Sequence, residues 1–166
     1  MDFYERIKKI CGEHNKVALF VDMDGTLVEY NVFPDGAVTT ESRGLFVDNK
    51  PLNFIIDKIK RINELKNIDI YILTYSRSNI IREEKKIWLK KYMPFIKESN
   101  YIILVKENGD YNSENRNYVK GNKMLEKANE YDYLILLDDD HNILRNTKKA
   151  LKDRGEVFHV SSAIVE

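Results

Sequence analysis

The sequence predicts an α/β fold of the Rossmann-like, three-layer kind, with a parallel sheet covered by helices on both faces. Short apolar runs alternate along the chain with amphipathic helical patterns, and each run is rich in Val, Ile, Leu or Tyr. The runs are too short to be buried helices. Parallel strands joined through helices explain this alternation. At 166 residues, the chain is expected to form one domain over residues 1–166.

The predicted elements follow in a regular order. A first helix is indicated by Phe3, Ile7, Ile10 and Cys11, which recur at helical spacing before Gly12. Strands are predicted at 17–21, 68–73, 101–105, 133–137 and 157–160, and helices at about 51–66, 78–92, 122–130 and 142–153. The polar stretch 106–121 is expected to be a long surface loop, of the kind that is often functional or mobile.

Composition limits the classes of function. Lys and Arg number 27, as do Asp and Glu, so the net charge gives no electrostatic argument for binding nucleic acid or a membrane surface. Cys11 is the only cysteine, which rules out an internal disulfide and suggests a reducing compartment. The first 15 residues lack the apolar region of a signal peptide, and no apolar run approaches the ~20 residues of a membrane span. A cytoplasmic location is therefore expected.

Chemistry-bearing residues follow the predicted strands. Ligands of open parallel sheets bind beyond the carboxyl ends of the strands. The residues found there are Asp22 and Asp24 after the first strand, Thr74 after the second, Lys106 and Glu107 after the third, and Asp138, Asp139 and Asp140 after the fourth. The fold is expected to bring them together.

The acidic clusters indicate a cation. A simple turn would explain "DMDGT" (22–26), and a calcium loop fails because its sixth and twelfth positions hold Leu27 and Phe33 instead of Gly and Glu. The run "LLDDDHN" (136–142) places three adjacent acids at the end of a buried strand, where they repel one another. Mg²⁺, which prefers carboxylate, phosphate and water oxygens, would remove that repulsion.

The sequence also indicates a site for an anion. Ser76 or Ser78 could cap a helix, and the hydroxyl of Thr74 beside free N–H groups at a helix start could bind a phosphate. Asn122 is interpreted as an N-cap, which places Lys123 in a first helical turn, where the helix dipole disfavours a cation. A bound anion would reverse that penalty. Lys120 is the second choice for the same role.

In this order, "FVDMDGTL", "YILTYS", a lysine opening a helix and "LILLDD" resemble the four motifs of the haloacid dehalogenase (HAD) phosphatase superfamily. The resemblance spans residues 17–145. It implies that Asp22 is a nucleophile that forms an aspartyl-phosphate and that Asp24 is the general acid/base. It also implies that Mg²⁺ is bound by Asp22, the main-chain carbonyl of Asp24, Asp138 and Asp139.

A closer resemblance is to the 5′(3′)-deoxyribonucleotidase-like branch of that superfamily. Residues 82–96, "REEKKIWLKKYMPFI", and 138–144, "DDDHNIL", resemble its segments "EKxxW" and "DDRxDI". Lys85 lies inside the apolar stripe of its helix, so either it snorkels or, as the family implies, it reaches the substrate phosphate. The expected phosphate-binding residues are Thr74, Tyr75, Ser76, Lys85 and Lys123.

The resemblance implies a small phosphomonoester substrate, a nucleoside 5′-monophosphate in particular. The cap differs from that branch, because residues 28–50 form at most a short cap or flap insertion. Phe33 and Phe46 in this insertion could stack on a base, although packing within the protein is the alternative for each.

The same residues have three alternative interpretations. An uncapped HAD phosphatase could act on a polynucleotide 3′-phosphate end. A phosphate- and Mg²⁺-binding signalling module without catalysis is another alternative, but no catalytic position is missing. A receiver domain fits poorly, because there the acid pair comes first and the lysine last, whereas here the acid pair follows the lysine.

Overall fold

The computed structural model describes residues 1–30 and 46–165. Its strands are β1 (Val17–Val21), β2 (Ile68–Ser76), β3 (Tyr101–Val105), β4 (Tyr133–Asp138) and β5 (Gly155–His159). Its α-helices are α1 (Phe3–Glu13), α2 (Asn53–Asn63), α3 (Asn79–Tyr92), α4 (Arg116–Leu125), α5 (His141–Leu151) and the short α6 (Ser161–Ile164). Single 3₁₀ turns lie at η2 (Phe46–Asp48), η3 (Glu98–Asn100), η4 (Lys106–Asn108) and η5 (Lys152–Arg154).

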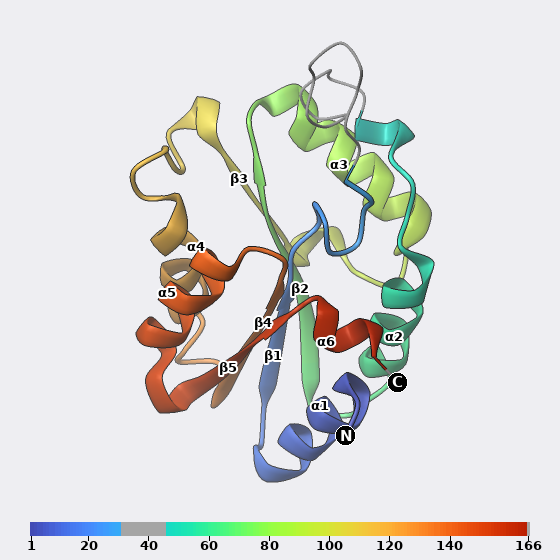
Figure 1. The fold of residues 1–166 in the computed structure, drawn as a ribbon, viewed down its shortest axis with the longest axis vertical. Coiled ribbons are helices and arrows are strands. Elements are labelled where there is room, and N and C mark those ends of the chain that lie inside the picture. Colours follow the sequence, from blue (N-terminus) through green and yellow to red (C-terminus); the bar gives the residue numbers. More distant parts are fainter. Residues whose placement is uncertain (31–45, 166) are drawn as a thin grey trace.

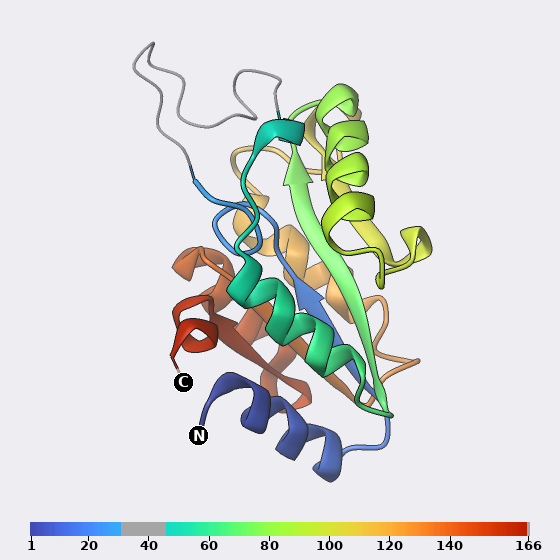
Figure 2. The ribbon, with the colours of Figure 1, turned by 90° about the vertical axis from the view of Figure 1, so that its right-hand side faces the viewer.

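The five strands form one parallel sheet with the order β3-β2-β1-β4-β5. Helices cover both faces: α4 and α5 lie on one side, and α1, α2, α3 and α6 lie on the other (Figures 1 and 2). This is the predicted three-layer α/β fold.

Alternate residues of the strands fill two separate cores. In β1, Val17, Leu19 and Val21 pack toward the layer of α1, α2 and α3, whereas Ala18 and Phe20 pack toward α4 and α5. All five residues of β1 are buried. A strand that is buried on both faces must be apolar throughout, which explains why the strands are read as continuous apolar runs.

The strand order sets the position of the site. From β1 the chain goes to β2 and β3 on one side of the sheet, and then crosses to β4 and β5 on the other. A crevice forms where the order reverses, between the carboxyl ends of β1 and β4. The register pairs Val21 of β1 with Leu137 of β4, so Asp22 and Asp138 follow neighbouring positions at this crevice.

The predicted strands and long helices agree with the structure to within a few residues, except around α4, and the short α6 was not predicted. Residues 106–121, expected to be a loop, include η4 and the first half of α4, and α4 begins at Arg116 and not near Asn122. Its buried face consists of Lys120, Gly121 and Met124. On the buried face of a helix, apolar residues are the usual sequence signal. Here a lysine and a glycine occupy two of these positions, so the signal for the first half of α4 is weak.

The length and composition of the described helices bear on whether they could cross a membrane. None of those within residues 1–30 and 46–165 combines the length and the apolar composition that crossing a bilayer requires.

Candidate active site

A tight turn after β1 positions the first two carboxylates. The carbonyl of Met23 accepts hydrogen bonds from the N–H groups of Thr26, Leu27 and Val28, and the side chains of Met23, Leu27 and Val28 are buried. Gly25 has φ +72°, which residues with a Cβ rarely adopt. The turn therefore anchors Asp22 and Asp24 at the sheet edge by burying the residues around them.

Three carboxylates meet where β1 and β4 end. Asp22, Asp138 and Asp139 each offer an oxygen, and these oxygens lie within 4.8 Å of one another. Asp22 and Asp138 are buried, and Asp139 is half-buried. A Cβ at position 25 would lie 2.2 Å from Oδ2 of Asp139, so the glycine also makes room for this carboxylate. The cluster is a set of hard oxygen donors of the kind that binds Mg²⁺.

Lys120 lies between two of these acids. Its Nζ donates to Oδ1 of Asp22 at 2.8 Å and to Oδ2 of Asp138 at 2.6 Å. Burial lowers the pKa of this lysine, but the carboxylates of Asp138 and Asp22 raise it more strongly, so the net shift is upward. Lys120 is thus a buried ammonium group held within the acid cluster.

The prediction that Lys123 lies in the first turn of a helix is wrong. Lys123 lies in the last turn of α4, and its Nζ donates to Oε1 of Glu126 at 3.2 Å. Its side chain is 38% exposed, and it does not belong to the described residues that line the cavity. The error follows from the misplaced start of the helix: with α4 beginning at Arg116, it is Lys120 and not Lys123 that faces the sheet.

A second buried lysine contacts the other aspartate of the turn. Nζ of Lys85 in α3 donates to Oδ2 of Asp24 at 2.7 Å, to Oγ1 of Thr74 at 3.1 Å and to the carbonyl oxygen of Tyr75. The side chain of Lys85 is fully buried, whereas that of Asp24 is 23% exposed. Lys85 therefore connects Asp24 to the end of β2.

The predicted phosphate-binding residues differ in their positions. Tyr75 lines the cavity, but Thr74 and Ser76 are completely buried beside it, and the hydroxyl of Ser76 donates to the carbonyl oxygen of Ser78. The cap of α3 is Ser78, whose hydroxyl accepts from the N–H of Ile81.

Asp140, the third acid of the run, makes hydrogen bonds and an ion pair that stabilise the structure. It caps α5 by accepting from the N–H groups of Asn142 and Ile143, and it pairs with Arg116 at 3.0 Å. Burial raises the pKa of Asp140, but the guanidinium of Arg116 and the two N–H groups outweigh burial, so the pKa is lowered overall.

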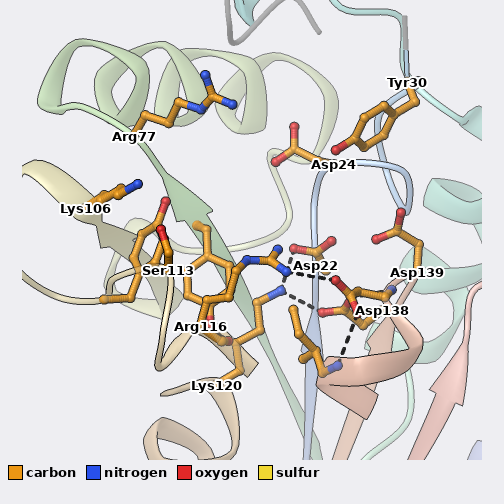
Figure 3. Close-up of a pocket in the computed structure, with 14 residues that line it drawn as sticks. Asp22, Asp24, Tyr30, Arg77, Lys106, Ser113, Arg116, Lys120, Asp138 and Asp139 are labelled. Atoms are coloured by element: carbon orange, nitrogen blue, oxygen red, sulfur yellow. Dashed lines mark hydrogen bonds and ion pairs between the residues drawn. The ribbon is translucent and has the colours of Figure 1, made fainter. Parts of the chain in front are cut away.

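The acids and the lysine border one cavity of about 280 Å³ (Figure 3). Sequence reasoning named part of its lining: Asp22, Asp24, Tyr75, Asp138 and Asp139 as site residues, Lys120 as second choice, and Lys106 and Asp140 as strand-end residues. The residues that it missed are Tyr30, Arg77, Tyr111, Ser113, Arg116 and Ile143. Arg77 could have been predicted from the rule that ligands bind beyond the carboxyl ends of the strands, because it directly follows β2.

Of the two aromatic residues suggested for stacking on a base, Phe46 lies among the described residues, and its position does not support that role. Phe46 is fully buried and packs edge-on against Trp88, with ring centroids 6.4 Å apart. It is part of the core, which is the alternative that the sequence left open. Phe33 and most of the expected insertion 28–50 lie outside the described residues, but its two ends are hydrogen-bonded from the N–H of Glu29 to the carbonyl of Lys50.

The electrostatics of the acid cluster favour a cation. Burial raises the pKa of Asp22 well above its usual value, and Asp138 adds to the effect, while Lys120 opposes it. The pKa of Asp139 is raised to about 6 by burial and by the charge of Asp138. One ammonium group among three such carboxylates leaves a net negative charge, and a divalent cation would balance it.

No protein-family model and no curated protein sequence matches the chain. Among fifteen matching chains of solved structures is the HAD domain of effector protein Lem4 from Legionella pneumophila. It is 14% identical, and the match covers 87% of either chain with a TM-score of 0.51. At this identity the similarity concerns the fold alone: the chain has a HAD-like Rossmann fold.

Proposed function

We propose that the chain is a HAD-type phosphatase that hydrolyses phosphate monoesters through an aspartyl-phosphate on Asp22. The observation that carries this proposal is the convergence of Asp22, Asp24, Lys120 and the acids of β4 on one cavity at the switch point of the sheet. The sequence motifs that resemble those of HAD phosphatases supply these same residues, with Lys120 in place of Lys123.

In the first half-reaction, an oxygen of Asp22 attacks the phosphorus and the bond to the substrate alcohol breaks. Asp24 gives its proton to the departing alkoxide. In the second half-reaction, Asp24 takes a proton from water, the water oxygen attacks the same phosphorus, and phosphate leaves while the Asp22 carboxylate is restored. Dividing the reaction in this way replaces one difficult displacement by two easier ones.

The two buried lysines support these roles. Lys120 holds Asp22 by a hydrogen bond of 2.8 Å and places a positive charge beside the attacked phosphoryl group. Lys85 holds Asp24 at 2.7 Å and so fixes the acid/base at the cavity wall. In this proposal Lys85 positions the acid/base, and its contact with the phosphate is indirect.

Asp22, Asp138 and Asp139, together with the main-chain carbonyl of Asp24, would hold the Mg²⁺ ion. The donor set fits a hard cation, because three carboxylate oxygens lie within 4.8 Å of one another and the single ammonium of Lys120 compensates only part of their mutual repulsion. When bound, Mg²⁺ screens the approach of an anionic nucleophile to an anionic phosphate and stabilises charge in the transition state.

The proposed substrate is a small phosphomonoester, specifically a nucleoside 5′-monophosphate. The cavity of about 280 Å³ lies near the lower end of the range for small-ligand pockets, ~300–1,000 Å³. The resemblance to the deoxyribonucleotidase-like branch supports a nucleotide. Among the aromatic rings that line the cavity, Tyr30 is 58% exposed and could stack on its base.

The test is Mg²⁺-dependent phosphate release from a panel of nucleoside monophosphates, sugar phosphates and a 3′-phosphorylated oligonucleotide. Asp22→Asn should reduce turnover by about 10³-fold or more, as loss of a catalytic nucleophile does. The matched control is Asp57→Asn, an exposed aspartate of α2, which should retain the wild-type rate. Substantial turnover by Asp22→Asn would exclude the covalent mechanism, and a clear preference for the oligonucleotide would exclude the small substrate.

A further inference from the structure

We propose that the preferred substrate carries a second phosphate besides the one that is cleaved, and that Arg77 and Lys106 bind it. This inference rests on the proposed phosphatase activity and narrows its substrate class to small bisphosphorylated molecules.

The first argument is the distribution of charge around the cavity. Two cations line the cavity beside the acid cluster: Lys120, which pairs with Asp22 and Asp138, and Arg116, which pairs with Asp140. Among the described residues, every acid that lines the cavity lies at the carboxyl end of β1 or β4 or just beyond it. Arg77 and Lys106 line the cavity from the ends of β2 and β3, so one wall is acidic and the other is basic.

The second argument is that the basic wall is held in place by the fold. Ser76 of β2 pairs with Val105 of β3, so Arg77 and Lys106 directly follow paired positions. The N–H of Glu107 donates to the carbonyl oxygen of Arg77 at 3.2 Å, which links the two loops beyond the strands. In Figure 3, Arg77 and Lys106 lie on one side of the cavity, with Tyr30 and Asp139 on the other.

The neighbouring acid does not line this wall of the cavity. Glu107 accepts hydrogen bonds from the main-chain N–H of Asn79 at 3.0 Å and from its side-chain amide at 3.2 Å, at the start of α3. It is not one of the described residues that line the cavity. The Glu107 carboxylate lies at the helix end, and Arg77 and Lys106 border the space where substrate would lie.

A guanidinium and an ammonium on the same wall suit a phosphate. Arg presents a planar fork of donors that matches phosphate oxygens, and Lys adds a compact charge. The cleaved phosphate must lie at Asp22 on the opposite wall, so the second phosphate belongs to another position of the same molecule. The small volume and the absence of a net positive charge favour a small bisphosphate over a polynucleotide.

The experiment compares kcat/KM for matched pairs: a nucleoside 5′-monophosphate with its 3′,5′-bisphosphate, and a sugar monophosphate with its bisphosphate. Wild type should prefer the bisphosphate by about tenfold or more, as expected for hydrogen bonds between charged groups. Arg77→Gln combined with Lys106→Gln should bring this preference close to one. Lys149→Gln, an exposed lysine of α5, is the matched control and should keep it.

Two further arms separate the possible failures. A dinucleotide with a terminal phosphate supplies its second anion as a phosphodiester, and a preference for it over both bisphosphates would overturn the proposal. Binding of the same ligands to Asp22→Asn, measured by calorimetry, does not depend on turnover. If phosphatase activity is absent, tighter binding of bisphosphates than of monophosphates still supports the second-phosphate site. If activity is present but monophosphates and bisphosphates give equal values in both assays, the second-phosphate site is excluded and the phosphatase proposal stands.

Discussion

The helices α3 and α4 both bury a lysine against an aspartate of the turn after β1, but the surroundings of the two lysines differ. Lys85 of α3 shares its buried face with Ile81, Trp88 and Leu89, and its carboxylate partner is partly exposed. Lys120 of α4 shares its face with Gly121 and Met124, and both of its carboxylate partners are buried.

The difference teaches that the same chemical group can be placed by two means. Around Lys85, a strong apolar stripe forms the helix and carries the lysine into the interior. Around Lys120, the absence of a side chain at Gly121 lets α4 approach α5: a Cβ there would lie 3.3 Å from Cα of Thr147. The close approach, together with ion pairing, buries Lys120.

The largest effect should come from removing the ammonium of Lys120. Lys120→Met leaves Asp22 and Asp138 buried without their cation, and breaking a buried pair in this way typically costs about 3–5 kcal/mol. Urea unfolding should show this loss without added metal, and Mg²⁺ should restore part of it. Lys123→Met, on the exposed side of the same helix, should change stability by less than about 0.5 kcal/mol. Equal losses from the two variants would contradict the assignment.

Removing Lys85 should destabilise the protein less. Asp24 is 23% exposed, so water can solvate its carboxylate in Lys85→Met, and a cost of about 1–3 kcal/mol is expected. Turnover should fall while the Kd of Mg²⁺ changes little, because Lys85 contacts Asp24 and not the three-acid cluster. A Mg²⁺ titration of both lysine variants checks this. Similar shifts in Mg²⁺ affinity would show that the two regions are not distinct.

A pair of glycines tests the packing argument. Gly121→Ala adds a methyl group against the backbone of α5, so the usual gain of about 1 kcal/mol in helix propensity should be offset and turnover should fall as Lys120 shifts. Gly12→Ala in α1 meets nothing within 4 Å and should stabilise the protein, by up to about 1 kcal/mol. Thermal unfolding of both variants measures the comparison. Equal stabilisation, with full activity in Gly121→Ala, would refute the close-packing explanation.

A pH dependence of stability should come from the acid cluster. The pKa of Asp139 is about 6 in the folded chain against a usual 3.8, so the folded state binds more protons between these values. Stability should therefore fall as pH rises from about 4 to about 6 and then level off. Asp139→Asn should lack this part of the fall, and Mg²⁺ should reduce it in the wild type. Identical pH profiles of unfolding free energy for wild type and variant would argue against the raised pKa.

Much of the site could be predicted from residues that directly follow apolar strands. Asp22, Asp24 and Asp138 were found in this way because a parallel sheet aligns the carboxyl ends of its strands whatever the helices do. Lys106 and Arg77 occupy equivalent positions, yet single cations after a strand are too common to be distinguished from solvated surface residues. What distinguishes Arg77 and Lys106 is that both line the same cavity as the acids, which only the tertiary structure shows.

By itself, the sequence determined the α/β class, the five parallel strands and the acidic sheet edge, because hydrophobic periodicity and strand-end positions are local properties that need no partner. The tertiary structure decided that Lys120 and not Lys123 faces Asp22, that Phe46 belongs to the core, and that a basic wall faces the acids. These outcomes depend on how closely α4 approaches α5 and on which side chains share one cavity. Such contacts join residues far apart in the chain, so no local pattern encodes them.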